Sequence, residues 1–134
     1  MELARSGFLF DAVSKFEAVV KADKRGEVAD DALFNAGACF LKMGLYHDAV
    51  AYFSRVLQGY PDAKIHAVPG AMEVGRTAAK AHLGTLHAYL AMGQRDNASK
   101  ELETLKQYTD SYVIVPDGSK KTFHQLGVEA LAGK

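Results

Sequence analysis

Residues 30–63 read DDALFNAGACFLKMGLYHDAVAYFSRVLQGYPDA, and this stretch decides the fold. It is 34 residues long and contains two amphipathic segments joined by a short turn. Gly37 and Ala49 are small, which lets two antiparallel helices approach closely. Phe40 and Phe53 are large enough to fill the space that remains between them. The stretch therefore predicts a helical hairpin with a close backbone contact.

The ends of both helices are marked by residues that helices tolerate only at their ends. Gly44 takes the left-handed conformation that commonly follows a helix, without steric cost. Pro61 lies just past the second helix, where its missing N–H group does no harm. These two residues indicate the turn and the end of the hairpin.

Composition describes an ordinary globular chain and excludes several functional classes. The 134 residues suffice for one domain with a substantial core, and 49% of them are hydrophobic. Sixteen basic and sixteen acidic residues give a net charge of zero, which argues against nucleic-acid binding and against a membrane-surface module. No transmembrane run and no signal peptide are evident. We therefore expect a cytoplasmic protein as written, or a periplasmic one if the chain is a fragment.

An Ala-x3-Phe pattern recurs along the chain. Ala12 with Phe16 precedes Ala49 with Phe53, and Ala98 stands in the same place in a third segment. The second spacing is 49 residues, which exceeds the 34-residue length of the middle stretch by 15. Residues 62–77, where Pro and Gly interrupt the pattern, hold this surplus. We interpret this segment as an insertion between two helical units.

Hydrophobic periodicity predicts helices throughout the chain. The expected helices cover residues 2–22, 28–43, 46–58, 71–92, 95–108 and 120–131. The apolar stripe of the first helix is expected to consist of Leu3, Phe8, Ala12, Val13, Phe16, Val19 and Val20. Residues 112–115 are expected to form an extended connection or a short strand, and Asp117 or Ser119 to cap the last helix.

The order Leu33, Ala36, Gly37, Phe40, then Ala49, Phe53 and Pro61, resembles the tetratricopeptide repeat family. The resemblance implies an all-α, right-handed stack of antiparallel helix hairpins, with about two and a half repeats and a C-terminal helix. The single domain, residues 1–134, then divides into a half repeat at 1–22, a full repeat at 30–63, the insertion at 62–77, a degraded repeat at 78–108 and a capping helix at 119–131. The Tyr-Pro ending at Tyr60 is also similar to bacterial envelope repeat proteins, namely the Tol–Pal coordinator and outer-membrane assembly lipoproteins.

The same resemblance implies that the first helix of each repeat lines a concave groove for a peptide or a partner helix. In the middle repeat the groove residues would be Asp31, Phe34, Asn35, Ala38, Leu41 and Lys42. In the third repeat they would be Lys80, Leu83, Gly84, His87, Leu90 and Ala91.

Chaperone-binding members of the family grip a terminal carboxylate with a Lys/Asn/Arg set. Asn35 and Lys80 stand at two of those positions here, but Gly84 stands where the Arg is expected, so the set is incomplete. An amide such as that of Asn35 can pair with both the N–H and the C=O of a bound backbone. Lys42 and Lys80 would attract an acidic peptide.

Other candidate chemistry is weaker. His82 and His87 are five residues apart on a helix, which turns their rings away from each other, and zinc sites usually need four ligands. Cys39 lies in an apolar segment with no base near it in sequence, which is typical of a buried, inert thiol. We expect no cofactor and no metal.

The sequence thus predicts a non-catalytic module that binds a protein or peptide partner in its groove. Two alternatives stay open. One is an assembly protein that oligomerises through its repeat ends, because the first helix lacks a preceding partner. The other is an enzyme or metal-binding domain that uses His82 and His87.

Overall fold

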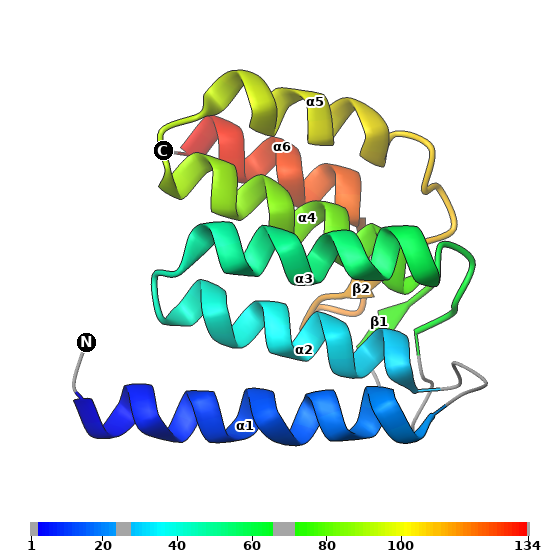
Figure 1. Cartoon of the computed structure of the whole chain (residues 1–134). Coiled ribbons are helices and arrows are strands. Elements are labelled where there is room, and N and C mark those ends of the chain that lie inside the picture. Colours follow the sequence, from blue (N-terminus) through cyan, green and yellow to red (C-terminus); the bar gives the residue numbers. More distant parts are fainter. Residues whose placement is uncertain (1–2, 24–27, 66–71, 134) are drawn as a thin grey trace.

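The computed structural model describes residues 3–23, 28–65 and 72–133. In this part of the chain, helices dominate and three very short strands accompany them (Figure 1). The elements, in chain order, are α1 (Leu3–Ala22), α2 (Ala29–Lys42), α3 (Tyr46–Gly59), β1 (Glu73–Val74), α4 (Thr77–Ala91), α5 (Arg95–Leu105), β2 (Tyr112–Ile114), β3 (Lys120–Thr122) and α6 (Phe123–Gly133).

The helices form a stack of hairpins, as the sequence predicted (Figure 1). α2 pairs with α3, α4 pairs with α5, and α4 also packs against both helices of the preceding hairpin. α1 packs on α2, and α6 packs on α4 and α5 at the other end. Gly44 and Gly93 both have positive φ angles at the turns that join the two helices of each hairpin, which is the conformation that glycine adopts most easily.

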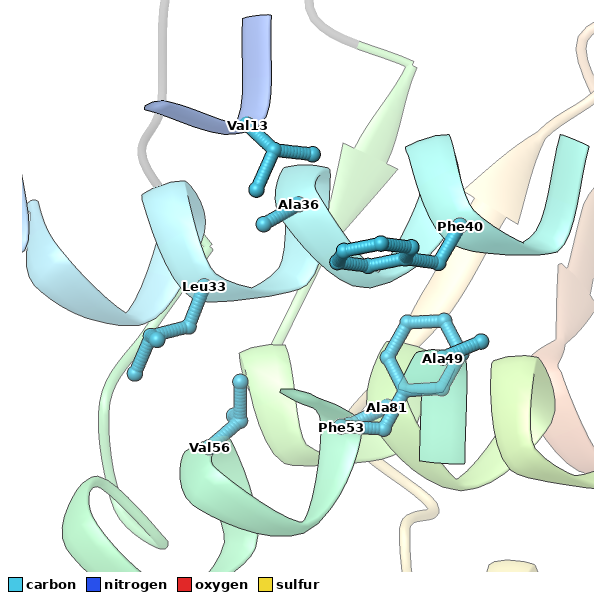
Figure 2. Packing of buried hydrophobic residues seen from close by; sticks show 8 residues of the cluster. All are labelled: Val13, Leu33, Ala36, Phe40, Ala49, Phe53, Val56 and Ala81. Carbon is cyan, nitrogen blue, oxygen red and sulfur yellow. The ribbon is translucent and has the colours of Figure 1, made fainter. Parts of the chain in front are cut away.

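Phe53 is the centre of the first core (Figure 2). Its ring is fully buried and lies between two glycines of different hairpins, Gly37 on α2 and Gly84 on α4. A Cβ atom added at either glycine would lie 2.6 Å from a carbon of the ring. Phe53 therefore fixes how closely α2, α3 and α4 approach one another.

The predicted helix boundaries hold within one residue for α2 and α3, but three predictions are wrong. α4 begins at Thr77 and not at residue 71, because Glu73–Val74 forms β1; residue 71 itself lies outside the described residues. α5 ends at Leu105 rather than at residue 108. α6 begins at Phe123 because residues 120–122 form β3.

The cap of α6 also differs from the prediction. The Thr122 hydroxyl accepts the N–H of Gln125 at 3.1 Å, and the Gln125 side-chain oxygen accepts the N–H of Thr122 at 2.7 Å. This reciprocal pair is a capping box. Asp117 and Ser119 instead hydrogen bond to each other in the turn between β2 and β3.

The three strands form one antiparallel sheet in the order β1-β2-β3. Glu73 pairs with Val113 and Val74 with Tyr112, and Val113 in turn pairs with Lys121. The alternative of a short strand at residues 112–115 is therefore the one the structure adopts. Gly75 has a φ of +119° and lies against the backbone of Ser111, so a side chain at this position would meet both strain and a backbone clash.

The apolar stripe of α1 is rotated from its predicted position. Leu9 and Val13 are buried and Phe16 and Val20 are partly buried, whereas Phe8 and Val19 are 74% and 40% exposed. The side chain of Leu3 lies outside the described residues. The stripe was misread because two apolar faces lie side by side on this helix, and only one of them contacts α2.

An ion pair between Glu17 and Arg55 connects α1 to α3. The two terminal guanidinium nitrogens of Arg55, Nη1 and Nη2, donate to Glu17 at 2.7 and 3.1 Å, and the Tyr52 hydroxyl donates to the same carboxylate at 2.5 Å. The hydrogen bond from Arg55 lowers the pKa of Glu17. Burial and the neighbouring Glu17 carboxylate raise the pKa of Tyr52 to about 12.

We predict that Gly37→Ala and Gly84→Ala each destabilise the protein by about 1–3 kcal/mol, because overpacking a rigid core has a cost of that order. Urea unfolding followed by circular dichroism measures the change. Gly59→Ala is the control: it lies at the end of α3 with nothing within 4 Å of the added Cβ, and should be neutral or stabilising.

Phe53→Leu should reduce the cost of both glycine substitutions, because it removes the ring atoms that the new methyl group meets. Equal costs in the wild-type and Phe53→Leu backgrounds would contradict the proposed role of this ring.

We predict that the Glu17 ion pair stabilises the fold at neutral pH and is lost in acid. Because the folded-state pKa of Glu17 is depressed, its contribution is complete above its ordinary pKa of 4.5 and disappears as the pH falls through the folded value. The two side chains are 38% and 44% exposed, so the effect is below about 1 kcal/mol. The difference in unfolding free energy between wild type and Glu17→Gln should shrink as the pH falls. Glu103→Gln, in an exposed pair with Lys106, is the matched control.

Candidate protein-binding groove

The face of interest is formed by the first helices of the two hairpins, α2 and α4, and we call it the first-helix face. Its residues are those that the repeat pattern assigns to a groove: Asp31, Phe34, Asn35, Ala38, Leu41 and Lys42 on α2, and Lys80, Leu83, His87, Leu90 and Ala91 on α4. α2 and α4 pack side by side, and the contact of Lys80 with Phe34 joins their groove residues directly.

The α2 half of this face is accessible. Asp31, Phe34, Asn35, Ala38 and Leu41 are all partly exposed, and Lys42 is exposed. Within the described residues the amide of Asn35 makes no hydrogen bond. The α2 half therefore offers an apolar strip with an unpaired donor and acceptor on it.

The α4 half begins with a lysine that is not accessible. Lys80 is only 8% exposed; its Nζ lies 2.9 Å from Oε1 of Glu73 and 4.4 Å from the centre of the Phe34 ring. Phe34 in turn packs on Phe53, with ring centres 5.4 Å apart. The charge of Lys80 is thus satisfied within the chain, by a residue of the insertion.

Beyond Lys80, the α4 residues of the first-helix face are again partly or fully exposed. Leu83 and Leu90 pack partly against the second core, which is built around Leu86, Leu105 and Phe123. His87 is exposed and lies with Leu90, Ala91 and Ala130 of α6 around a hollow of about 540 Å³. Partial removal of water by the surrounding helices lowers the pKa of His87.

Gly84 does not belong to the exposed face. It is buried against Phe53, so an arginine at this position would disrupt the core rather than line a groove. The repeat register alone placed it in the groove, and no local signal in the sequence reveals its contact with Phe53.

The two histidines of α4 lie in different surroundings. Nδ1 of His82 is 2.9 Å from Glu101 of α5, and its ring lies against Tyr108. His87 points away from this pair into the hollow next to α6. In the described part of the chain no three His, Cys, Asp or Glu side chains gather as metal ligands would. Burial raises the pKa of the Cys39 thiol, which lowers its reactivity at neutral pH.

A family model described as tetratricopeptide repeat matches residues 31–63, which cover α2 and α3. The matched segment is one tetratricopeptide repeat, 33 of the 134 residues of the chain. No curated protein matches the chain. The weaker similarity to bacterial envelope proteins is not confirmed by the match.

The match adds what the family does in general. Tetratricopeptide repeats mediate protein–protein interactions and are typically non-catalytic. Among the described residues no helix is both long and apolar enough to cross a membrane.

The prediction from sequence did not include Glu73 among the residues of this face. It lies in the insertion, outside the repeat pattern, and is brought to Lys80 by the pairing of β1 with β2. An acidic residue seven positions before a groove lysine is too common to signal such a contact.

Proposed function

We propose that this protein is an interaction module that binds an extended segment or a helix of a protein partner along the first-helix face. The observation that carries the proposal is the amide of Asn35, which is accessible and has no hydrogen-bond partner among the described residues. It lies on the same helix as the partly exposed Ala38 and Leu41, so a polar anchor and an apolar strip occur together.

This combination suits a bound backbone. Burying Ala38 and Leu41 beneath a partner removes apolar area from water, which contributes roughly 25 cal/mol for each Å². The Asn35 amide can then donate to a backbone C=O and accept from a backbone N–H of the partner. Such pairing orients the ligand, because a partner segment in another register leaves the amide buried and unpaired.

His87 and Leu90 extend the proposed surface toward α6. The hollow that they line with Ala91 and Ala130 is large enough for one side chain of a partner. Lys42, at the end of α2, is the exposed cation of the α2 half. Lys80 contributes no accessible charge in the present arrangement, because it is paired with Glu73.

We predict that Asn35→Ala combined with His87→Ala weakens partner recovery roughly tenfold, as the loss of one or two buried hydrogen bonds implies. The measurement is a quantitative pull-down from cells that express the protein, with partners identified by mass spectrometry and their affinities measured afterwards with purified components.

Gln58→Ala on α3 provides the control, because it removes an exposed amide from the opposite helix of the same hairpin. If the variant with both groove substitutions recovers every partner as well as Gln58→Ala does, the first-helix face is not the binding surface.

A second candidate function, self-association through α1, is favoured by its exposed apolar side chains. Phe8 and Val19 are 74% and 40% exposed on the side of α1 next to the one that contacts α2. Phe8 and Val19 lie three turns apart on this side of the helix, and large exposed apolar side chains such as Phe8 occur at surfaces that another protein covers.

We predict for this candidate that Phe8→Ser lowers the weight-average mass measured by light scattering at high concentration toward that of one chain. Val128→Ser, which removes a similarly exposed apolar side chain from α6, should leave the mass unchanged. A wild-type protein that stays monomeric over the whole concentration series would rule out self-association.

A further inference from the structure

The repeat pattern assigns Lys80 to the groove, but in the structure its ammonium group is shielded from solvent. Its side chain is 9% exposed, and a buried ammonium group is tolerated only when an anion balances it. Among the described residues the anion within ion-pair distance is Glu73. The Phe34 ring beneath the ammonium adds a cation–π contact at 4.4 Å.

The two partners of this pair are held unequally. Lys80 extends from the first turn of a regular helix of 15 residues, whereas Glu73 belongs to a strand of two residues and its side chain is 43% exposed. The strand is anchored by pairing with β2 and by a hydrogen bond from the N–H of Ile65 to the carbonyl of Gly75. Hydrogen bonds from the N–H of Ile114 to the carbonyl of Met72 and from the N–H of Thr77 to the carbonyl of Ala63 hold the flanking residues. This short ladder is small compared with the helix that carries Lys80, so β1 is the partner of the pair that opens more easily.

The surroundings of Lys80 describe what the pair covers. Phe34 lies beneath the ammonium, and Asn35, its neighbour on α2, carries the unpaired amide. Together these residues offer a cation, an aromatic ring and a backbone anchor. The segment that now contacts Lys80 is extended, and it places the Glu73 carboxylate on the ammonium group while the side chain of Val74 lies on the other face of the strand.

We propose that the Glu73 carboxylate occupies the position on the Lys80 ammonium group that an acidic side chain of the partner takes in the complex. β1 and the partner therefore compete for Lys80. This inference rests on the proposed function and names the partner class: an extended protein segment that carries an acidic residue, as β1 does. The partner carboxylate replaces that of Glu73 on Lys80, and its backbone pairs with Asn35.

The competition has a direct physical consequence for affinity. In the open state, β1 has moved away from Lys80. If the partner binds only the open state, its apparent affinity equals its intrinsic affinity multiplied by the fraction of molecules in that state. Removing the Glu73 carboxylate leaves the Lys80 ammonium without its anion, which raises the open fraction. A minor state is commonly populated at a few per cent, so the gain in affinity is about tenfold or more.

The first test measures whether Glu73 shields Lys80. Acetic anhydride labels accessible lysines, and mass spectrometry quantifies each site. Acetylation of Lys80 should rise severalfold in Glu73→Ala and in Glu73→Gln, which keeps the shape of the side chain. Glu103→Ala, which frees Lys106 from an exposed pair, should leave the labelling of Lys80 unchanged. Circular dichroism verifies that each variant is folded.

The second test measures what the uncovered site binds. The probe is a fluorescein-labelled peptide of alternating Glu and Val, with an alternating Gln and Val peptide as its neutral counterpart. Fluorescence anisotropy should show that Glu73→Ala binds the acidic peptide about ten times more tightly than wild type does. The gain should be absent for the neutral peptide and in Glu73→Ala/Lys80→Met, where methionine keeps the contact with Phe34 but not the charge.

The two tests contradict different parts of the inference if they fail. Unchanged acetylation of Lys80 in both Glu73 variants overturns the shielding, and equal binding of the acidic and neutral peptides overturns the acidic partner. Neither result bears on Asn35, whose role is decided separately by partner recovery with Asn35→Ala/His87→Ala. A failure of this inference is therefore distinguishable from a failure of the proposed function.

Discussion

The structure depends on one ring, Phe53, which is enclosed by two glycines from different hairpins. Because Phe53 is fully buried and Gly37 and Gly84 leave it no spare room, the ring sets the separation of α2 and α4. That separation in turn places Phe34 beneath Lys80, and so fixes the accessible sides of α2 and α4 relative to each other. The interaction that holds the stack together is thus also the one that shapes its accessible face.

Much of the middle repeat was predictable from sequence, and the reason is local. Gly44 requires a backbone conformation that few other residues accept, and Gly37 and Ala49 are small where two helices of one hairpin cross. The contact of Gly84 with Phe53 was not predictable, because it joins residues of different repeats. The register of the second repeat assigned Gly84 to the groove, and only the packing of one hairpin on the next reverses that assignment.

A short strand at residues 112–115 was one of two expectations for that segment, but the two strands that pair with it were not predicted, for a different reason. Strands of two or three residues carry too few side chains for an alternation to be recognised, and β1 and β3 were both read as parts of helices. What holds β1 is its pairing with a strand some forty residues away in the chain, together with the close approach of Gly75 to Ser111. The stripe of α1 shows the same limit, since the sequence shows that Phe8 is apolar but not which side of the helix α2 covers.

The accessible charge of the groove cannot be obtained by counting residues. Lys42 and Lys80 are equivalent as cations in the composition, but the fold leaves Lys42 exposed and closes Lys80 with Glu73. The repeat helices supply the position of the cation, while the insertion supplies the anion that covers it. The repeat pattern does not include the residues of an inserted segment. Two proteins with the same residues on this face can therefore differ in the charge that is accessible there. The segment between the hairpins, rather than the hairpins themselves, therefore decides whether the charge of Lys80 is accessible on this face.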